Sequence, residues 1–429
     1  MSTATAHLRD LFARNRRGQR TGVYSVCSAH PLVLEAALGL AAQRRQVAVI
    51  EATCNQVNHE GGYTGMQPAD FAARVKQIAD GIGYDGHLVL GGDHLGPQPW
   101  RRLAAGEAML RAEAMVRAYV GAGFTKIHVD CSMPCADDPA DLSEDVIAER
   151  AARLAAVAES AAPDRNAPPI YIIGTEVPPP GGMGEGHDIV PTSPASVSST
   201  WSAHAAAFAS RGLGSAMDRV VAMVVQPGLD FGNESVVPFR PAQARALCEA
   251  VLQFPAAIFE AHSTDYQQPA AYRSLVEGHF AILKVGPAAT FALREALYAL
   301  EAVEAELIAP EDRSGLRAAL EAAMLADPGN WASHYHGDQA QQHYLRHFSY
   351  SDRSRYYWTV PAVDAAVKRL FANLSQRLIP LPLISQYLPQ LRNRVEAEGL
   401  APTPRALGIA NVQRALSAYA DACGTHAAA

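Results

Sequence analysis

Short runs of aliphatic and β-branched residues alternate along the chain with longer stretches rich in alanine and leucine. Eight runs have the composition of buried strands, and they begin near residues 22, 47, 88, 126, 170, 220, 257 and 281. Most intervals between them contain a helical pattern, such as PLVLEAALGLAAQRR or PADFAARVKQIADGI. Parallel strands need crossover connections of this length. The pattern therefore predicts eight successive strand–helix units.

The predicted strands are apolar along most of their length, which indicates burial on both faces. This favours a closed (β/α)8 TIM barrel, with a doubly wound open sheet as the competing arrangement. Beyond residue 290 the pattern becomes almost wholly helical. We expect a barrel over residues 1–290 and a helical extension over 291–429 that packs on it. The N-terminal stretch predicts an amphipathic surface helix, and the segment PLPLISQYLP predicts an irregular wrap around the barrel.

The composition excludes several classes of protein. Hydrophobic residues make up 49% of the 429 residues and charged residues 18%, so a large core can form and wholesale disorder is excluded. The net charge of -7, without a long basic run, argues against binding to nucleic acid or a membrane surface. No apolar run approaches the length of a membrane span, and no export signal is recognisable. Six scattered cysteines without a CxxC pair favour a reducing, cytoplasmic location.

Polar side chains gather where the predicted strands end. In a TIM barrel these ends meet at one face, which is where the active sites of such enzymes lie. A few such residues could simply close the barrel mouth with hydrogen bonds, but all eight strands supply them. In chain order, the candidates are Ser28, Glu51, Asn55, Asp93, His94, Asp130, Ser132, Glu176, Gln226, Glu260, His262, Asp265 and Lys284.

A divalent metal ion is the simplest organiser of these groups, because imidazole and carboxylate from different strands form an open catalytic site. We predict His94, Glu176 and His262 as ligands of zinc, manganese or nickel. The alternative is that each histidine is a hydrogen-bonded residue of the barrel rim. Asp93 directly precedes His94, and neighbours in a strand point to opposite faces, so both reach the site only if the strand has already ended. Otherwise Asp93 orients a metal ligand.

Two further segments suggest ligand binding. The Gly-rich segment PPPGGMGEGHDIVP predicts a mobile lid, with an ordinary connection as the alternative, and it lacks the helix start of a dinucleotide fingerprint. No P-loop sequence is present, so neither NAD nor ATP is expected as a cofactor. The aromatic stretch FSYSDRSRYYW, with Arg353 and Arg355, could hold an anionic substrate in a neighbouring subunit of a homo-oligomer. Packing of the extension on the barrel is the favoured interpretation.

A collinear series of segments over about residues 22–415 resembles the accessory subunits of tagatose-bisphosphate aldolase, formerly labelled tagatose-6-phosphate kinases. The series includes GVYSVCSAHP, EATCNQVN, GGDHLGP, HVDCSM, GTEVPPPGG, FEAHSTDYQ, LKVGPA and FSYSDRSRYYW. The resemblance implies a barrel related to class II aldolases, a role in galactitol or N-acetylgalactosamine catabolism, and a separate catalytic aldolase subunit as partner. Some relatives in this family are described as metal-dependent ketohexose 4-epimerases, so the resemblance also implies that activity as a possibility for this chain.

The same resemblance bears on the metal site. Catalytic class II subunits carry His-x-Asp-His at the third strand, where this chain has Gly-Gly-Asp-His at 91–94. Their Gly-Thr-Ala-His becomes Gly-Thr-Glu-Val at 174–177, and His262 corresponds to the histidine of their strand-seven motif. The exchange of one imidazole for a carboxylate argues against bisphosphate aldolysis and keeps a two-histidine, one-carboxylate site.

Two functions remain open. The first is a 4-epimerase of a ketohexose or its phosphate that breaks and re-forms the C3–C4 bond, with Asp93 or Asp130 moving the C4 hydroxyl proton and Glu260 or Gln226 orienting hydroxyls. The residues expected to contact the substrate are Ser28, Glu51, Asn55, Ser132, Gln226, Asp265 and Lys284. The second is a non-catalytic subunit that stabilises a partner aldolase. Grouped carboxylates repel one another unless a cation neutralises them, which favours the enzyme.

Overall fold

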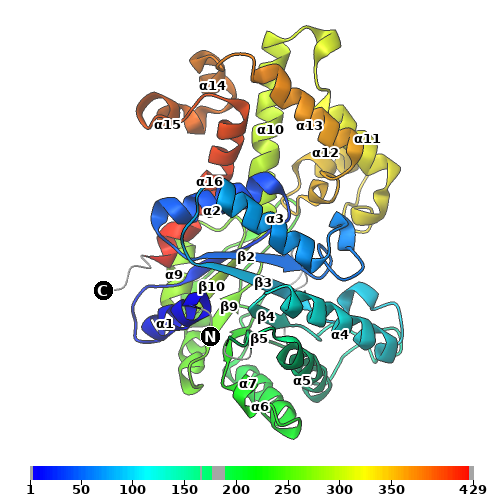
Figure 1. Cartoon of the computed structure of the whole chain (residues 1–429), viewed down its shortest axis with the longest axis vertical. Coiled ribbons are helices and arrows are strands. Elements are labelled where there is room, and N and C mark those ends of the chain that lie inside the picture. The colour runs from blue at the N-terminus through cyan, green and yellow to red at the C-terminus, as the bar shows by residue number, and fades with distance from the viewer. Residues whose placement is uncertain (1–2, 165–166, 176–188, 425–429) are drawn as a thin grey trace.

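Eight parallel strands form a closed barrel at the centre of the molecule (Figure 1). The computed structural model describes residues 3–164, 167–175 and 189–424. The barrel strands are β1 (Val23–Cys27), β2 (Ala48–Thr53), β3 (Leu88–Leu95), β4 (Lys126–Val129), β5 (Ile170–Ile173), β6 (Val220–Val224), β9 (Ile258–Ala261) and β10 (Phe280–Val285). The ring closes where β1 pairs with both β2 and β10. The eight predicted strands and the closed barrel are confirmed, and the open-sheet alternative is wrong.

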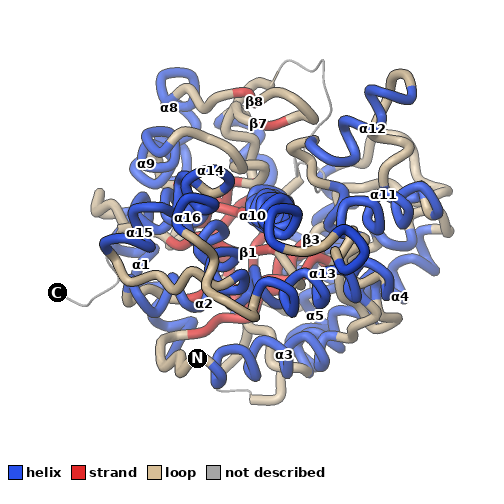
Figure 2. The backbone as a smooth tube through the Cα atoms, turned by 90° about the horizontal axis from the view of Figure 1, so that it is seen from above, coloured by secondary structure: helices blue, strands red, loops and turns tan. Residues whose placement is uncertain are grey.

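Helices that follow the strands cover the outside of the barrel (Figure 2). They are α2 (Pro31–Arg44), α3 (Pro68–Gly81), α4 (Ala105–Gly121), α5 (Glu144–Ala161), α6 (Pro194–Ser210), α7 (Gly214–Met217), α8 (Pro241–Ala250), α9 (Pro269–Glu277) and α10 (Pro287–Leu307). A two-stranded sheet of β7 (Asp230–Phe231) and β8 (Val236–Val237) follows β6. These strands are too short for periodicity to predict. Within the described ranges, no helix has both the length and the apolar character needed to cross a membrane.

The amino-terminal end of the barrel is closed by apolar side chains. Helix α1 (Thr3–Arg16) buries Leu8, Leu11 and Phe12 against inward-facing strand residues that include Val49 and Ile172. The expected amphipathic helix is therefore present, but its apolar face belongs to the barrel core. Polar groups inside the barrel collect towards the opposite, carboxyl end.

The chain after α10 forms the predicted helical extension. It comprises α11 (Leu316–Ala326), α12 (Gln339–Phe348), α13 (Pro361–Leu374), α14 (Leu381–Tyr387), α15 (Arg392–Ala397) and α16 (Pro404–Cys423). Helix α16 returns to the barrel and contacts α2, α9 and α10 (Figure 1). The expected division at residue 290 falls inside α10. The segment expected to be irregular forms α14, because its prolines lie in the first turn and beyond the last.

A buried ion pair fastens the extension to the barrel. The Asp352 carboxylate accepts hydrogen bonds from Arg294 Nε at 2.8 Å and from Thr290 Oγ1 at 2.5 Å, and both donors belong to α10. The aromatic stretch therefore packs on the barrel of its own chain, which was the favoured interpretation. This packing brings Arg355 and Tyr356 to the barrel mouth.

Candidate active site at the carboxyl end of the barrel

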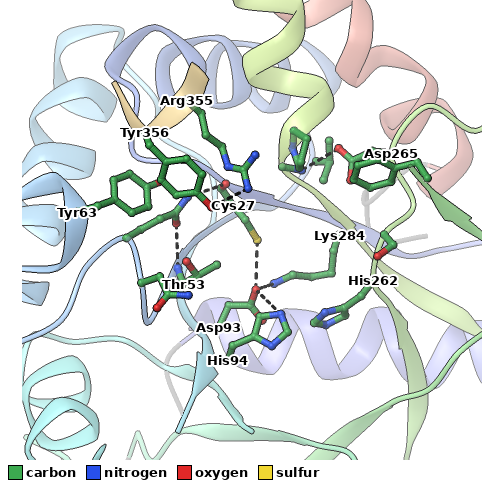
Figure 3. A pocket seen from close by; sticks show the side chains of 17 residues that line it. Cys27, Thr53, Tyr63, Asp93, His94, His262, Asp265, Lys284, Arg355 and Tyr356 are labelled. Atoms are coloured by element: carbon green, nitrogen blue, oxygen red, sulfur yellow. Dashed lines mark hydrogen bonds and ion pairs between the residues drawn. The ribbon is translucent and has the colours of Figure 1, made fainter. Parts of the chain in front are cut away.

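A pocket of about 660 Å³, partly open to solvent, lies over the carboxyl ends of the strands (Figure 3). The barrel and the extension both contribute to its walls. Its polar lining includes Cys27, Asn55, Asp93, His94, His262, Asp265 and Lys284 from the barrel, and Arg355 and Tyr356 from the extension.

Charged side chains fill the barrel at the base of this pocket. Lys126 Nζ lies 2.5 Å from Glu51 Oε1 and 2.6 Å from Glu260 Oε2. Lys284 Nζ forms an ion pair with Glu51 and lies 3.0 Å from Asp93 Oδ2. None of these five side chains is more than 7% exposed. A buried charge is costly unless it is paired, so each lysine stabilises the carboxylates on either side of it.

Three imidazoles lie in the same region, and each is held by its own carboxylate. The pairs are His94 Nδ1 with Asp130 Oδ2 at 2.7 Å, His128 Nδ1 with Asp93 Oδ1 at 2.9 Å, and His262 Nε2 with Glu260 Oε1 at 2.9 Å. The three ring centroids are 4.9 to 5.3 Å apart. An ionised carboxylate only accepts, so in the neutral imidazoles of His94 and His262 the nitrogen facing the carboxylate carries the proton and the other ring nitrogen keeps its lone pair. His128 Nδ1 faces both the Asp93 carboxylate and the His94 amide, which donates to it at 3.2 Å, so either tautomer leaves one of these two contacts unmade. Pairs of this kind orient metal ligands.

Asp93 and His94 both face the pocket although they are neighbours in β3. The pairing register between β3 and β4 shifts between Gly92 and Leu95, and His94 has a φ of 50°. A bulge of this kind turns one side chain away from the alternating pattern. The sequence interpretation required the strand to end before His94, but β3 continues to Leu95. An irregularity within it has the same effect, at a cost of about 1 to 3 kcal/mol for the left-handed residue.

Electrostatics keep the carboxylates ionised despite burial. Burial by itself raises the pKa of Asp93, but the neighbouring imidazoles outweigh it and hold that pKa well below its ordinary value. Burial also opposes ionisation of Glu260, yet Lys126 and an imidazole hydrogen bond lower its pKa to about 2. Burial lowers the pKa of His94, but Asp93 and Asp130 overcome it and raise that pKa to about 9. The site therefore favours added positive charge.

His128 and Lys126 belong to this site, and the sequence interpretation missed them. Strand β4 reads Lys-Ile-His-Val and is followed by Asp130. Because side chains alternate along a strand, Lys126, His128 and Asp130 share one face. Asp130 was already predicted at the barrel mouth, so the alternation was the signal that would have found the other two.

The other predicted residues have different places in the structure. Asn55, Asp93, His94, His262, Asp265 and Lys284 line the pocket, while Glu51, Asp130 and Glu260 hold lysines or imidazoles next to it. Three predicted side chains make local hydrogen bonds away from the pocket lining. The Ser28 hydroxyl accepts from the His30 amide, the Ser132 hydroxyl donates to Asp130, and the Gln226 side chain accepts from the amides of Gly228 and Leu229. Glu176 and most of the predicted Gly-rich lid lie outside the described residues.

The charge balance of the site suits a divalent cation. Four carboxylates (Glu51, Asp93, Asp130 and Glu260) accompany two lysines (Lys126 and Lys284), which leaves two negative charges when all three imidazoles are neutral and one when His94, whose pKa is raised to about 9, is protonated. Ligand atoms of Asp93, His128, Glu260 and His262 all lie within 4.8 Å of one another. His128 Nε2 is buried and has no hydrogen-bond partner in the described part of the chain. The residues present therefore fit a divalent metal ion.

Fold and site together define a (β/α)8 barrel with a buried group of imidazoles and carboxylates at the carboxyl ends of its strands. More narrowly, the chain belongs to the D-tagatose-1,6-bisphosphate aldolase subunit GatZ/KbaZ-like family, whose model matches residues 8–424. The family resemblance inferred from the sequence motifs is therefore confirmed over nearly the whole chain.

The chain is also similar to solved structures. A probable tagatose 6 phosphate kinase from Sinorhizobium meliloti 1021 is 49% identical, with a TM-score of 0.87 over 94% of this chain and 100% of that chain. A fructose-bisphosphate aldolase from Campylobacter jejuni is 13% identical, with a TM-score of 0.45 over 86% of this chain and 94% of that chain. The second match is too distant to inform the chemistry of this site.

Proposed function

We propose that this protein is a metal-dependent ketohexose 4-epimerase that cleaves and re-forms the C3–C4 bond of the sugar. One observation carries the proposal: three imidazoles, each held by a carboxylate, gather at the base of the pocket over the carboxyl ends of the strands. The family contributes the aldolase lineage. Retro-aldol cleavage accounts for inversion at C4, because the C4 hydrogen is not adjacent to the C2 carbonyl and its direct removal is poorly stabilised.

The metal ion has a described set of candidate ligands. His128 and His262 would hold it together with a carboxylate of the same group, and His94 lies beside them. Zinc, manganese or nickel bound there would polarise the C2 carbonyl and stabilise the negative charge left by bond cleavage. Glu176 remains a proposed ligand on the strength of the sequence pattern alone.

Asp93 is the residue best placed to move the C4 hydroxyl proton. It lines the pocket, and its carboxylate is ionised before the sugar binds. Lys284 Nζ, 3.0 Å from Asp93 Oδ2, offers a positive charge beside it. Asp130 instead holds His94 and Ser132, so it acts as a positioning residue. Asn55 lines the same pocket and would bind a sugar hydroxyl.

The assay incubates the purified protein with fructose or tagatose after loading with zinc, manganese or nickel in turn. We expect interconversion of the two sugars with at least one metal, and none after treatment with a chelator. Absence of interconversion with every metal would remove the proposal.

The family description supports a second candidate function, that of a subunit which stabilises a catalytic tagatose-bisphosphate aldolase. This function makes no use of the metal-site residues. In a mixture with a catalytic aldolase subunit, the His128→Ala and His262→Ala variants would then prolong the activity of the partner as well as wild type does. Loss of that effect together with loss of metal would count against it.

A further inference from the structure

The proposed inversion moves the C4 oxygen of the sugar from one position to another. Before the C3–C4 bond breaks, a base must take the proton of the C4 hydroxyl, and the bond electrons then pass to the enediolate. After the enediolate adds to the opposite face of the aldehyde, the new C4 alkoxide must receive a proton. Because the inverted oxygen no longer points to the group that took its proton, a second acid–base group is needed in addition to Asp93.

Three ionisable side chains of the pocket lie directly beside Asp93. Lys284 Nζ lies 3.0 Å and Cys27 Sγ 3.7 Å from Asp93 Oδ2. His94 Nε2 lies 3.8 Å from the same oxygen. Asp265 also lines the pocket, but its Oδ1 atom already accepts from two amides at the start of α10. The second group is therefore to be sought on the wall that the extension supplies.

Tyr356 lines the pocket from that wall, and Figure 3 shows it on the other side of the pocket from Asp93 and His94. It ends a short helical turn, Arg353–Tyr356, that begins after Asp352. Asp352 is bound by α10 and has a φ of 42°. Backbone strain of this kind persists only where the surrounding structure holds it in place. The extension thus fixes the position of Tyr356 in the pocket.

The hydroxyl of Tyr356 accepts a hydrogen bond and keeps its own proton available. A terminal nitrogen of Arg355 donates to Tyr356 Oη at 2.9 Å. Within the described ranges, no residue accepts the O–H proton of Tyr356. A phenol that accepts from a guanidinium can still donate its own proton to another acceptor. Since the side chain lines the pocket, a sugar oxygen bound there is such an acceptor.

Two guanidinium groups make this phenol more acidic than an ordinary tyrosine. The Cζ atoms of Arg355 and Arg353 lie 4.6 Å and 5.3 Å from the centre of the Tyr356 ring. Burial raises the pKa of Tyr356, but the two cations outweigh it and hold that pKa below its ordinary value. Burial instead raises the pKa of Tyr63, whose ring packs edge-on against that of Tyr356. An acid whose pKa lies closer to the working pH transfers its proton more effectively.

We infer that Tyr356 is the second acid–base residue of the epimerase and serves the C4 oxygen of one epimer, while Asp93 serves that of the other. This inference rests on the proposed function. In one direction Asp93 takes the C4 hydroxyl proton, the C3–C4 bond breaks and re-forms on the other face, and Tyr356 gives its proton to the C4 alkoxide. Asp93 then returns a proton to solvent and the phenolate takes one up. The reverse reaction uses the two residues in the opposite order.

The test separates bond cleavage from inversion in the metal-loaded full chain. Tyr356→Phe removes only the hydroxyl and keeps the ring against Tyr63, so we expect it to fold and to hold metal as wild type does. Interconversion of fructose and tagatose, and in parallel of their 1,6-bisphosphates, should fall about a hundredfold or more. Tyr344→Phe, at an exposed tyrosine of α12, is the matched control and should keep full activity.

Isotope exchange shows which step the hydroxyl serves. Labelled glyceraldehyde, or its 3-phosphate for the bisphosphates, enters the sugar whenever the C3–C4 bond breaks and re-forms. In Tyr356→Phe we expect exchange into one epimer to continue, because Asp93 alone serves it, and exchange into the other epimer to be lost. Unchanged interconversion, or equal exchange into both epimers, whether retained or lost, would overturn the inference.

The pH dependence of interconversion tests the acidity of the hydroxyl. Wild-type activity should fall on the alkaline side as the phenol ionises, because Asp93 and Tyr356 then hold no proton to transfer. Arg355→Met removes a charge that lowers the pKa of Tyr356, so we expect this alkaline limb to move upward by about one pH unit or more. A purely structural role of Tyr356 would leave the limb in place, and an unshifted limb would overturn the inference.

The same measurements distinguish this inference from the proposed function. Absence of both interconversion and exchange in the wild-type protein, with every metal and every sugar, would end the proposed function and this inference with it. Interconversion by wild type together with full activity of Tyr356→Phe would end the inference alone.

Discussion

In the part of the chain that the structure describes, two regions gather imidazoles and carboxylates at close range, and the first lies at the barrel mouth. There the ligand atoms of Asp93, His128, Glu260 and His262 lie within 4.8 Å of one another, and all four residues are buried. They come from distant parts of the sequence and meet only because the barrel closes. His128 Nε2 has no hydrogen-bond partner among the residues that the structure describes.

The second region, on the extension, contains Glu321 of α11 with His343 and His347 of α12. The two imidazoles are four residues apart on one helix, so local spacing alone places them on the same face. The Glu321 carboxylate is already bound by Arg346, at 2.9 Å from Nε and 2.5 Å from a terminal nitrogen. His343 is 54% exposed. The polar atoms of these three side chains are therefore largely hydrogen-bonded already, to Arg346 and to solvent.

The difference shows that ligand types and their proximity do not define a metal site. Both regions have histidine and carboxylate at close range, but only the barrel mouth combines burial, excess negative charge and an unpartnered imidazole nitrogen. Metal binding is most favourable where the ligand atoms have no other hydrogen-bond partners in the protein and are not reached by water.

The largest expected effect is on metal and activity when the barrel-mouth group is broken. We expect His128→Ala to lose the bound metal and to reduce epimerisation about a thousandfold, or about 4 kcal/mol in activation free energy. Metal analysis of the purified protein and the fructose–tagatose assay measure the two effects. His343→Ala is the matched control and should change neither. Full metal content in His128→Ala would place the ion elsewhere.

The second-largest expected effect is a loss of stability when the cation of each region is removed. The two cations, Lys126 at the barrel mouth and Arg346 on the extension, differ in how deeply their carboxylate partners are buried. Lys126 is 1% exposed between two carboxylates that are themselves fully buried, so Lys126→Met removes a shared counter-charge and leaves Glu51 with Lys284 and Glu260 with His262. We expect a loss of about 3 kcal/mol in the free energy of unfolding, measured by urea denaturation. Arg346 is 4% exposed, but its partner Glu321 is 19% exposed and can be solvated, so Arg346→Met should cost less, about 1 to 2 kcal/mol. Equal losses would show that burial does not distinguish the regions.

The third effect is the pH dependence of stability in the extension. Burial lowers the pKa of His347 to about 4, although Glu321 opposes that shift. Between about pH 6.5 and pH 4 the unfolded chain therefore binds a proton that the folded protein does not, and stability falls as the pH falls. We expect His347→Gln to remove about 1 to 2 kcal/mol of this loss. Urea unfolding at pH 7 and pH 4.5 measures it, and an unchanged difference between the two pH values would contradict it.

The fold was predictable because barrel strands buried on both faces form separate apolar runs, each followed by a helical pattern. Most of the residues at the barrel mouth were predictable for a related reason, because the carboxyl ends of parallel strands meet at one face of the barrel. Strand alternation would also have added Lys126 and His128 to Asp130.

Other parts of the site depend on features that periodicity does not encode. The bulge that turns both Asp93 and His94 to the pocket depends on the pairing of β3 with β4. The entry of Arg355 into the pocket depends on the packing of the extension through Asp352 and Arg294. The local bonding of Gln226 likewise follows from the turn after β6, which no strand pattern describes.

The smallest expected effect is that of His343→Ala on stability. The side chain is 54% exposed, and its Nδ1 atom lies 3.0 Å from Glu321 Oε1, which Arg346 also binds. Water can replace the imidazole at this carboxylate, so we expect a change within about 0.5 kcal/mol in the free energy of unfolding. The measurement is made by urea denaturation with and without added zinc. A zinc-dependent stabilisation that is present in wild type, retained in His128→Ala and lost in His343→Ala would show that the extension also binds metal, and the contrast between the two regions would fail.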